Sequence, residues 1–249
     1  MEIQPVAFYR GLLGSKFAVP RQSGLVPQLR GRIVFAEPFR SPDAIRGLEG
    51  FSRIWLIWGF SANSRNVASG MGLPVQFTSS PLPGECTGKP IPGAYSLLVR
   101  PPRLGGNEKV GVFASRSPFR PNPVGLSCVQ IERIDPEGPV IDVLGADLMD
   151  GTPIYDIKPY IPYADAFPDA KAGFAPSAPE AVLEVVEGPG WESPFNEEDT
   201  LALKQLLALD PRPAFHDDPG RIYGFPFGGF DIKFRVDGDR LLLLSARKI

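Results

Sequence analysis

The stretch GVFASRSPFRPNPVGLS, residues 111–127, joins two apolar segments through a loop that holds two arginines and three prolines. A strand inside a sheet does not accept this much proline, because each proline removes a backbone N–H donor and fixes φ. The stretch therefore predicts two β-strands joined by a rigid loop. That loop holds the guanidinium groups of Arg116 and Arg120 in one geometry, which suits an anion or a polar cofactor.

Short apolar segments between turn signals recur on both sides of this loop. They cover residues 5–15, 29–36, 51–61, 95–102, 109–115, 125–134, 139–148 and 152–161. This recurrence indicates antiparallel strands arranged as a barrel or a sandwich. None of these strands leads into a glycine-rich turn and a long helix, which argues against a Rossmann fold. Ser41 is expected to cap a short helical turn before the strand that holds Trp55 and Trp58.

The remainder of the chain predicts a second, smaller domain. Residues 196–209 form an amphipathic pattern with an acidic start, and Pro211 ends it, which is typical of one helix. Residues 221–249 predict a hairpin that turns at Asp237-Gly238. The fold class expected is mainly β, with an antiparallel barrel or sandwich as the N-terminal domain (1–165), a proline-rich linker (166–195) and a small α+β C-terminal domain (196–249).

Composition limits the classes of protein that fit. The 249 residues include 27 glycines and 29 prolines, about a fifth of the chain, which suits a loop-rich β protein. No apolar run reaches the roughly 20 residues needed to cross a bilayer, and the N-terminus lacks the layout of a signal peptide. Cys86 and Cys128 predict no disulfide framework. We therefore expect a cytoplasmic protein.

The residue types available exclude some chemistry. His216 is the only histidine, and the two cysteines lie far apart in the sequence, so no zinc site is expected. An all-carboxylate magnesium site stays open at this point, although no metal is expected.

Charge is unevenly distributed along the chain. Residues 1–133 hold 16 Lys+Arg against 7 Asp+Glu, a balance of +9, while residues 134–249 hold 10 against 21, a balance of −11. A basic half rich in arginine fits phosphate or carboxylate partners, although it is also compatible with an ordinary solvated surface.

Four polar segments share a rigid backbone: residues 17–22, 100–107, 111–127 and 147–165. In each, proline or glycine stands next to Arg, Asn, Asp or Lys. Such segments can build a preorganised pocket from backbone amides, fixed guanidinium groups and a few carboxylates.

These segments carry a resemblance to a known family. KFAVPRQSGLV, VRPPRLGGN, GVFASRSPFRPNPVGLS and DLMDGTPIYDIKPY, in this order, resemble the signatures of the TsaA-like (YaeB/TrmO) family, and ALDPRPAF with YGF and FDIKFRV extends the likeness almost to the C-terminus. The resemblance implies an antiparallel β-barrel that binds S-adenosylmethionine and works as a homodimer. It also implies methylation of N6 of threonylcarbamoyladenosine, just 3′ of the anticodon at position 37, in tRNA.

Cofactor positions follow from the resemblance residue by residue. They are Pro20, Arg21, Gln22, Ser61, Ala62, Arg116, Leu126, Leu148, Met149, Asp150 and Gly151. Ser61 and Ala62 stand where the family has His-Gln, so their contacts would be made through the backbone, and the span 63–99 is longer than the family's loop. Asp150 suits the ribose and amino groups, Arg21 or Arg116 the carboxylate, and Leu126 with Met149 the adenine. The alternative for Arg116 and Arg120 is an ion pair that pins the loop to Asp147 or Asp156.

For RNA, phosphate or stacking contacts are expected from Arg100, Arg103, Lys109, Arg120, Arg212 and Tyr223. The alternative for Tyr223 is packing between the two domains. Asp150, Asp156 and Tyr160 all remain open as proton acceptors, and no catalytic residue is named. Two other functions also stay open: a binding module without catalysis, and a methyltransferase for another small or modified-base substrate.

Overall fold

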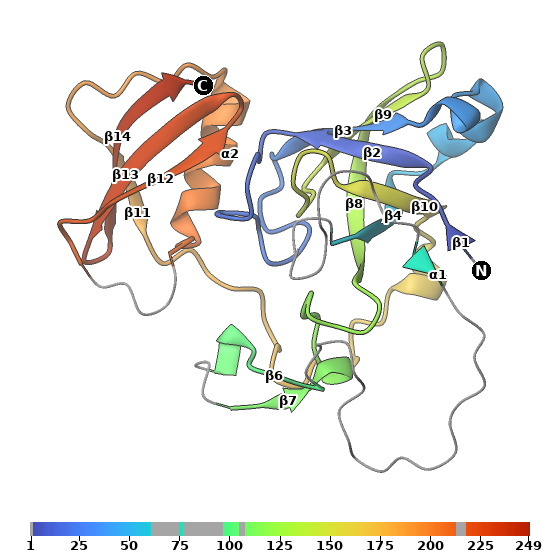
Figure 1. Ribbon diagram of the computed structural model, residues 1–249, viewed down its shortest axis with the longest axis horizontal. Coiled ribbons are helices and arrows are strands. Elements are labelled where there is room, and N and C mark those ends of the chain that lie inside the picture. Colours follow the sequence, from blue (N-terminus) through green and yellow to red (C-terminus); the bar gives the residue numbers. More distant parts are fainter. Residues whose placement is uncertain (1, 61–74, 77–96, 105–107, 213–217) are drawn as a thin grey trace.

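The computed structural model describes residues 2–60, 75–76, 97–104, 108–212 and 218–249. It has two lobes, a β-barrel and a smaller lobe with a sheet and a helix, which lie side by side along the long axis of the molecule (Figure 1). None of the described helices is long and apolar enough to cross a membrane.

Six strands close the barrel in the order β10-β2-β3-β9-β8-β4, with every neighbouring pair antiparallel. They are β2 (Ala7–Gly11), β3 (Arg30–Phe35), β4 (Arg53–Gly59), β8 (Val124–Asp135), β9 (Val140–Leu144) and β10 (Pro153–Pro159). Alternate residues face inward, such as Ile54, Leu56 and Trp58 on β4, and they form one apolar core. Of the two arrangements predicted, the barrel is therefore confirmed.

Tyr9 fills the barrel where β2 and β3 pair. Its side chain is buried, and its hydroxyl lies 3.5 Å from the Arg30 carbonyl oxygen, to which it donates. Its ring passes so close to Gly31 that a Cβ there would lie 2.1 Å from the Tyr9 hydroxyl oxygen. Gly31 is thus a steric requirement of the barrel.

We expect Gly31→Ala to lower the free energy of unfolding by about 2 kcal/mol, because the buried Tyr9 ring cannot move without disturbing the core. Gly50→Ala is the matched control, since a Cβ at Gly50 has nothing within 4 Å. Urea denaturation of both variants measures the difference, and equal midpoints for the two would contradict this account of Gly31.

Short elements surround the barrel. They are β1 (Glu2–Ile3), β5 (Val75–Gln76), β6 (Leu98–Val99), β7 (Val110–Gly111), α1 (Pro162–Asp165) and the 3-10 turns η1 (Glu37–Phe39), η2 (Pro42–Ala44), η3 (Leu48–Gly50), η4 (Pro102–Leu104) and η5 (Val112–Ala114). The Ser41 cap is confirmed, because its hydroxyl accepts from the Asp43 amide at 3.3 Å.

Two predicted strands are much shorter than expected. The segments 95–102 and 109–115 pair with each other only through β6 and β7, outside the barrel, and η5 takes up residues that the sequence predicted as strand. Pro101 and Pro102 end the first segment and Pro118 follows the second, and each removes a backbone donor, which limits the ladder.

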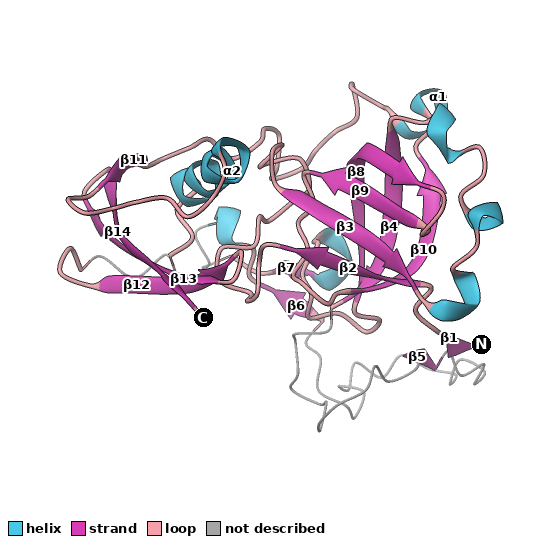
Figure 2. Cartoon of the chain, turned by 90° about the horizontal axis from the view of Figure 1, so that it is seen from above, coloured by secondary structure: helices cyan, strands magenta, loops and turns pink. Residues whose placement is uncertain are grey.

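The C-terminal lobe is an α+β unit. Its sheet has the order β11-β14-β13-β12, from β11 (Glu184–Glu187), β14 (Arg240–Lys248), β13 (Phe230–Asp237) and β12 (Ile222–Phe227). The helix α2 (Glu197–Ala208) packs against this sheet (Figure 2), and the Asn196 side chain caps it by accepting from the Asp199 amide at 2.8 Å. The predicted hairpin turn is present at Gly238, whose φ is 59°.

The segment 166–195, predicted as a linker, differs in its second half. Strand β11 lies within it and pairs in parallel with β14, because Val185 and its neighbours can pack on the C-terminal core. This half therefore belongs to the C-terminal sheet. The predicted helix buries Ala202, Leu203, Leu206 and Leu207, while Leu201 is exposed.

The two lobes share a core. The loop 12–29, which follows β2, contributes four buried side chains to one cluster with α2 and the C-terminal sheet. They are Leu13, Ala18, Val26 and Leu29. The Gly228 amide also donates to the Leu12 carbonyl at 2.8 Å. The loop 12–29 is therefore held by both lobes, which positions the predicted cofactor residues 20–22 that it carries.

Candidate cofactor and nucleic-acid site

Three of the four rigid segments meet at one end of the barrel. This end is formed by Gly11 at the end of β2, Gly59 at the end of β4, Val124 at the start of β8 and Pro153 at the start of β10. The loops 12–29, 112–123 and 145–152 leave from here. Gly24 and Gly145 fasten two of them together, since the Gly24 amide donates to the Gly145 carbonyl at 2.8 Å.

Asp147 is the residue on which these loops converge. The Ser127 hydroxyl donates to its Oδ1 at 2.5 Å and accepts in turn from Trp58 Nε1 at 2.9 Å. Burial raises the pKa of the Asp147 carboxyl, opposed by hydrogen bonds from Ser127 and the Ser23 backbone amide and by the charge of Arg116. One carboxyl thus joins the barrel wall to the loops that hold Ser23 and Arg116.

Asp150 occupies the tip of the same turn. Its amide donates to the Leu13 carbonyl at 2.8 Å, and Gly151 adopts φ 78°, which glycine accepts without strain. The Gly11 amide donates to Asp150 Oδ1 at 3.1 Å, and Arg10 Nη1 lies 3.5 Å from Oδ2. The carboxylate is therefore held in place while its side chain stays 41% exposed, so that a ligand can reach it.

Arg116 and Gln22 are in direct contact, although 94 positions separate them. Arg116 Nη1 donates to Gln22 Oε1, and Gln22 Nε2 donates to the Arg21 carbonyl. The charge of Arg116 also acts on the Asp147 carboxyl and lowers its pKa, against the effect of burial. The structure thus brings the predicted residues Gln22, Arg116 and Asp150 to the same end of the barrel.

Arg120 has a different partner from those anticipated. Its Nη1 donates to the Ser115 carbonyl at 3.1 Å, so it braces its own loop instead of pairing with Asp147 or Asp156. Ser115 and Ser117 stabilise the same loop, since their hydroxyl oxygens accept from the amides of Ser117 and Phe119.

The apolar cofactor candidates separate into two environments. Leu126 faces out of the barrel and is 57% exposed, whereas Leu148 is buried in the barrel core. Leu148 can therefore offer only its backbone to a ligand. Pro20 is also buried, and Met149 is half-buried. Ser61 and Ala62 lie outside the described residues.

The three possible proton acceptors do not lie together. Tyr160 is at the opposite end of the barrel, where its amide donates to the Arg53 carbonyl and its ring lies 5.9 Å from that of Trp55. Asp156 lies within β10 and pairs with Lys158 at 3.1 Å. Of the three, only Asp150 lies at the end where the loops converge.

The predicted RNA contacts also separate. Arg100 and Lys109 are exposed beside β6 and β7, while the Arg103 side chain lies outside the described part. Arg212 forms a two-pronged ion pair with Asp210 at 2.8 and 2.9 Å. Tyr223 is buried and its ring centroid lies 5.4 Å from that of Phe234, on which it stacks, so its ring belongs to the C-terminal core and not to an RNA-facing surface.

Sequence reasoning did not assign Ser127 and Trp58 to the site. Ser127 follows Leu126 on β8 but points into the barrel, and the pairing of β8 with β4 is what brings it to Trp58. The available signal was a polar residue at an inward position of an apolar strand. Among the described residues, no group of three His, Cys, Asp or Glu side chains is arranged to hold a metal ion.

Two family models together cover most of the chain. The tRNA-methyltransferase O N-terminal domain matches residues 9–166, and the TrmO C-terminal domain matches residues 193–249. The chain belongs to the TrmO family. The tRNA (adenine(37)-N6)-methyltransferase of Escherichia coli K12 is 35% identical over 245 residues, covering 94% of this chain and 93% of that relative.

Two further TrmO comparisons agree. A Pseudomonas aeruginosa protein described as a putative S-adenosylmethionine-dependent methyltransferase, RcsF, is 36% identical over 237 residues, 92% of this chain and 90% of that protein. The crystal structure of TrmO from Pseudomonas aeruginosa superposes with a TM-score of 0.70 at 28% identity, covering 99% of this chain and 97% of that one. The predicted family and fold are thus confirmed.

Proposed function

We propose that this chain methylates N6 of adenine 37 in tRNA, with the threonylcarbamoyl-modified adenosine as its base and S-adenosylmethionine as methyl donor. This activity is the one named for the Escherichia coli relative, which matches this chain over 93% of its own length. The observation that carries the site is the convergence of three loops, with Gln22, Arg116 and Asp150, at one end of the barrel around Asp147.

The residues present fit S-adenosylmethionine. Asp150, held by the Gly11 amide, would accept hydrogen bonds from the ribose hydroxyls or the amino group. The guanidinium of Arg116, braced by Gln22, would bind the carboxylate of the methyl donor, with Arg21 as the second candidate. Leu126 offers an apolar surface for the adenine, with Met149 beside Asp150, while Leu148 and Gly151 contribute backbone groups.

The reaction is an in-line displacement at the methyl carbon. The bond from that carbon to sulfur breaks, a bond to N6 forms, and N6 loses a proton. When bound, the cofactor supplies the activated methyl group, and the protein contributes mainly position and orientation. Arg116 and Asp150 would hold polar groups of the methyl donor, and Asp150 is the one of the three candidate proton acceptors that lies where the loops converge.

We also propose that the chain works as a cytoplasmic homodimer. Exposed apolar side chains gather on the loop and strand beside the site, with Phe113 76%, Phe119 56% and Leu126 57% exposed. Such a patch indicates a contact surface. Light scattering after size exclusion is expected to give twice the chain mass, and Phe113→Ser/Phe119→Ser to give a monomer. A monomeric parent protein would contradict the homodimer.

The activity is tested with labelled S-adenosylmethionine and bulk tRNA, followed by mass spectrometry of the nucleosides. We expect the label in N6-methylated threonylcarbamoyladenosine. Label in another nucleoside would indicate a methyltransferase for a different base, and binding of the donor without transfer would indicate a binding module; either result contradicts the proposal.

A further inference from the structure

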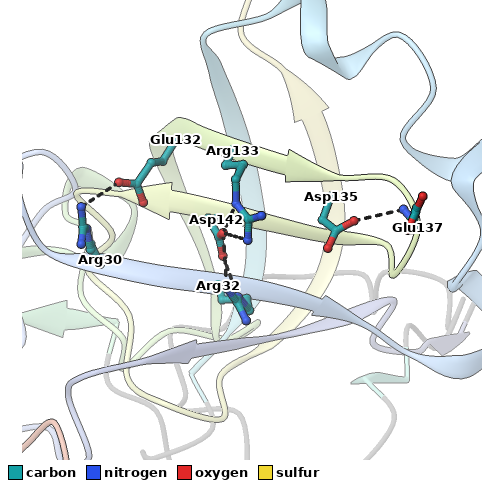
Figure 3. A network of polar contacts seen from close by, with 7 residues as sticks. All are labelled: Arg30, Arg32, Glu132, Arg133, Asp135, Glu137 and Asp142. Atoms are coloured by element: carbon teal, nitrogen blue, oxygen red, sulfur yellow. Dashed lines mark hydrogen bonds and ion pairs between the residues drawn. The ribbon is translucent and has the colours of Figure 1, made fainter.

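A row of arginines crosses the outside of the barrel next to the candidate site. In the strand register, Arg10 on β2 stands opposite Arg32 on β3, Arg32 stands opposite Asp142 on β9, and Asp142 stands opposite Arg133 on β8. We call these four residues the arginine row. Figure 3 shows Arg32 and Arg133 converging on Asp142 from two sides.

Asp142 fixes two members of the row. Arg32 donates to it through Nε at 2.6 Å and Nη2 at 3.3 Å, and Arg133 does so through Nε at 3.0 Å. Burial raises the pKa of Asp142, but the hydrogen bonds from both guanidinium groups outweigh it, so the pKa lies below its ordinary value. The carboxylate therefore stays charged. Its bonds use Nε and Nη2 of each arginine, so the Nη1 group of each arginine takes no part in them.

Arg10 makes the row unusual for a sheet surface. Like charges directly opposite each other on neighbouring strands are destabilising, yet Arg10 faces Arg32. The carboxylate that Arg10 contacts is Asp150, at 3.5 Å, in the candidate cofactor site. Three guanidinium groups thus lie beside two carboxylates, Asp142 and Asp150, and this excess of one positive charge favours an added anion.

The row lies along a groove. This groove, of about 580 Å³, is lined by Arg10, Gly11, Leu12, Arg30, Gly31, Arg32, Glu132, Arg133 and Asp142. Arg30 is tied down by Glu132 at 3.1 Å and by Glu198 of α2. With strands about 4.8 Å apart, the row spans roughly 14 Å from Arg10 to Arg133. That span exceeds a single phosphate and suits a short run of backbone.

We propose that the arginine row binds the phosphate backbone of the tRNA strand beside the base that is methylated. The proposal rests on the proposed function. Arginine matches phosphate oxygens with paired donors, and Asp142 holds two of these groups in advance of binding. Because Arg10 contacts Asp150, a strand in this groove passes directly beside the candidate methyl-donor site.

The test measures binding of a tRNA anticodon stem-loop by fluorescence anisotropy, without methyl donor, from about 50 to about 200 mM salt. For Arg32→Gln/Arg133→Gln we expect affinity to fall about tenfold at low salt. The slope of log K against log salt should become shallower by about 1.4 to 1.8, since each lost phosphate contact removes about 0.7 to 0.9. Unchanged affinity and slope would overturn the proposal.

Two controls separate this role from a structural one. Arg32→Lys/Arg133→Lys keeps both charges and should keep most of the slope, whereas a purely structural role would make the Lys and Gln pairs behave alike. Arg40→Gln/Arg46→Gln removes two exposed, ion-paired arginines of the segment that follows β3, at the other end of the barrel, and should change neither quantity.

Folding and the proposed function are controlled separately. If the double Gln variant does not fold, Arg133→Gln alone should still reduce the slope by about 0.7 to 0.9. RNA binding that depends on the row, without methyl transfer by the parent protein, would overturn the proposed function alone. Methyl transfer to tRNA with no effect of the row on binding would overturn this inference alone.

Discussion

Asp147→Ala is expected to lower the free energy of unfolding by about 2–3 kcal/mol and to weaken S-adenosylmethionine binding roughly tenfold or more. The Ser127 hydroxyl is buried and would lose its acceptor, as would the Ser23 amide. The loops that hold Ser23 and Arg116 would then lose a shared contact. Calorimetric titration with S-adenosylmethionine and urea denaturation measure the two effects. Full stability with full affinity would show that Asp147 is not the residue that joins these loops.

Asp147→Asn separates geometry from charge. Asparagine still accepts from Ser127, but it carries no charge toward Arg116. Burial raises the pKa of Asp147 in the folded protein, so the folded state holds this proton more tightly than the unfolded state. The free energy of unfolding of the native protein should therefore fall, relative to that of Asp147→Asn, as the pH rises from the ordinary pKa of 3.8 through the raised pKa of the folded state. Stability curves that run parallel across this range would contradict the assignment.

Arg116→Gln is expected to weaken S-adenosylmethionine binding by about 10- to 100-fold, because a charged hydrogen bond to a carboxylate contributes roughly 1.5–3 kcal/mol. The affinity of Arg116→Lys should lie between those of the native protein and Arg116→Gln, since lysine retains the charge and loses the paired geometry. Isothermal titration calorimetry measures all three proteins.

Two comparisons make the Arg116 result specific. 5′-Methylthioadenosine lacks the amino-acid part of the donor, so its affinity should not respond to Arg116→Gln. Arg120 lies in the same loop and donates to the Ser115 carbonyl. Arg120→Gln removes this bond and should change the affinity for S-adenosylmethionine by no more than about twofold. If both ligands lost affinity equally, Arg116 would act on the loop as a whole and not on the carboxylate.

Much of the local structure was predictable because local rules decide it. Alternating apolar residues predicted the long strands, such as β4 and β8, since one side of each strand must be buried. Ser41 was predicted as a cap, and Asp237-Gly238 as a turn, from residue types that suit those backbone conformations. The resemblance also indicated the segments that meet at the candidate site.

The sequence was least informative where a residue's environment depended on distant parts of the chain. Tyr223 was expected at an RNA surface, but the sheet turns its side of β12 toward α2 and Phe234. Tyr160 follows a motif that also contains Asp150, yet β10 spans the barrel and separates the two. In both cases the sequence shows the residue type and not the direction in which the side chain is buried.

The sequence by itself determined the strands, the rigid loops, the basic first half and the family. The residue pattern alone left barrel and sandwich open, and the resemblance implied the barrel. The structure confirms the barrel, because β10 pairs with both β2 and β4 and so closes the sheet. Only the tertiary structure decided that Arg10, Arg32, Asp142 and Arg133 form one row, although up to 132 positions separate them. The physical reason is that strand register between distant segments is set by how all the inward side chains pack together, which no local pattern records.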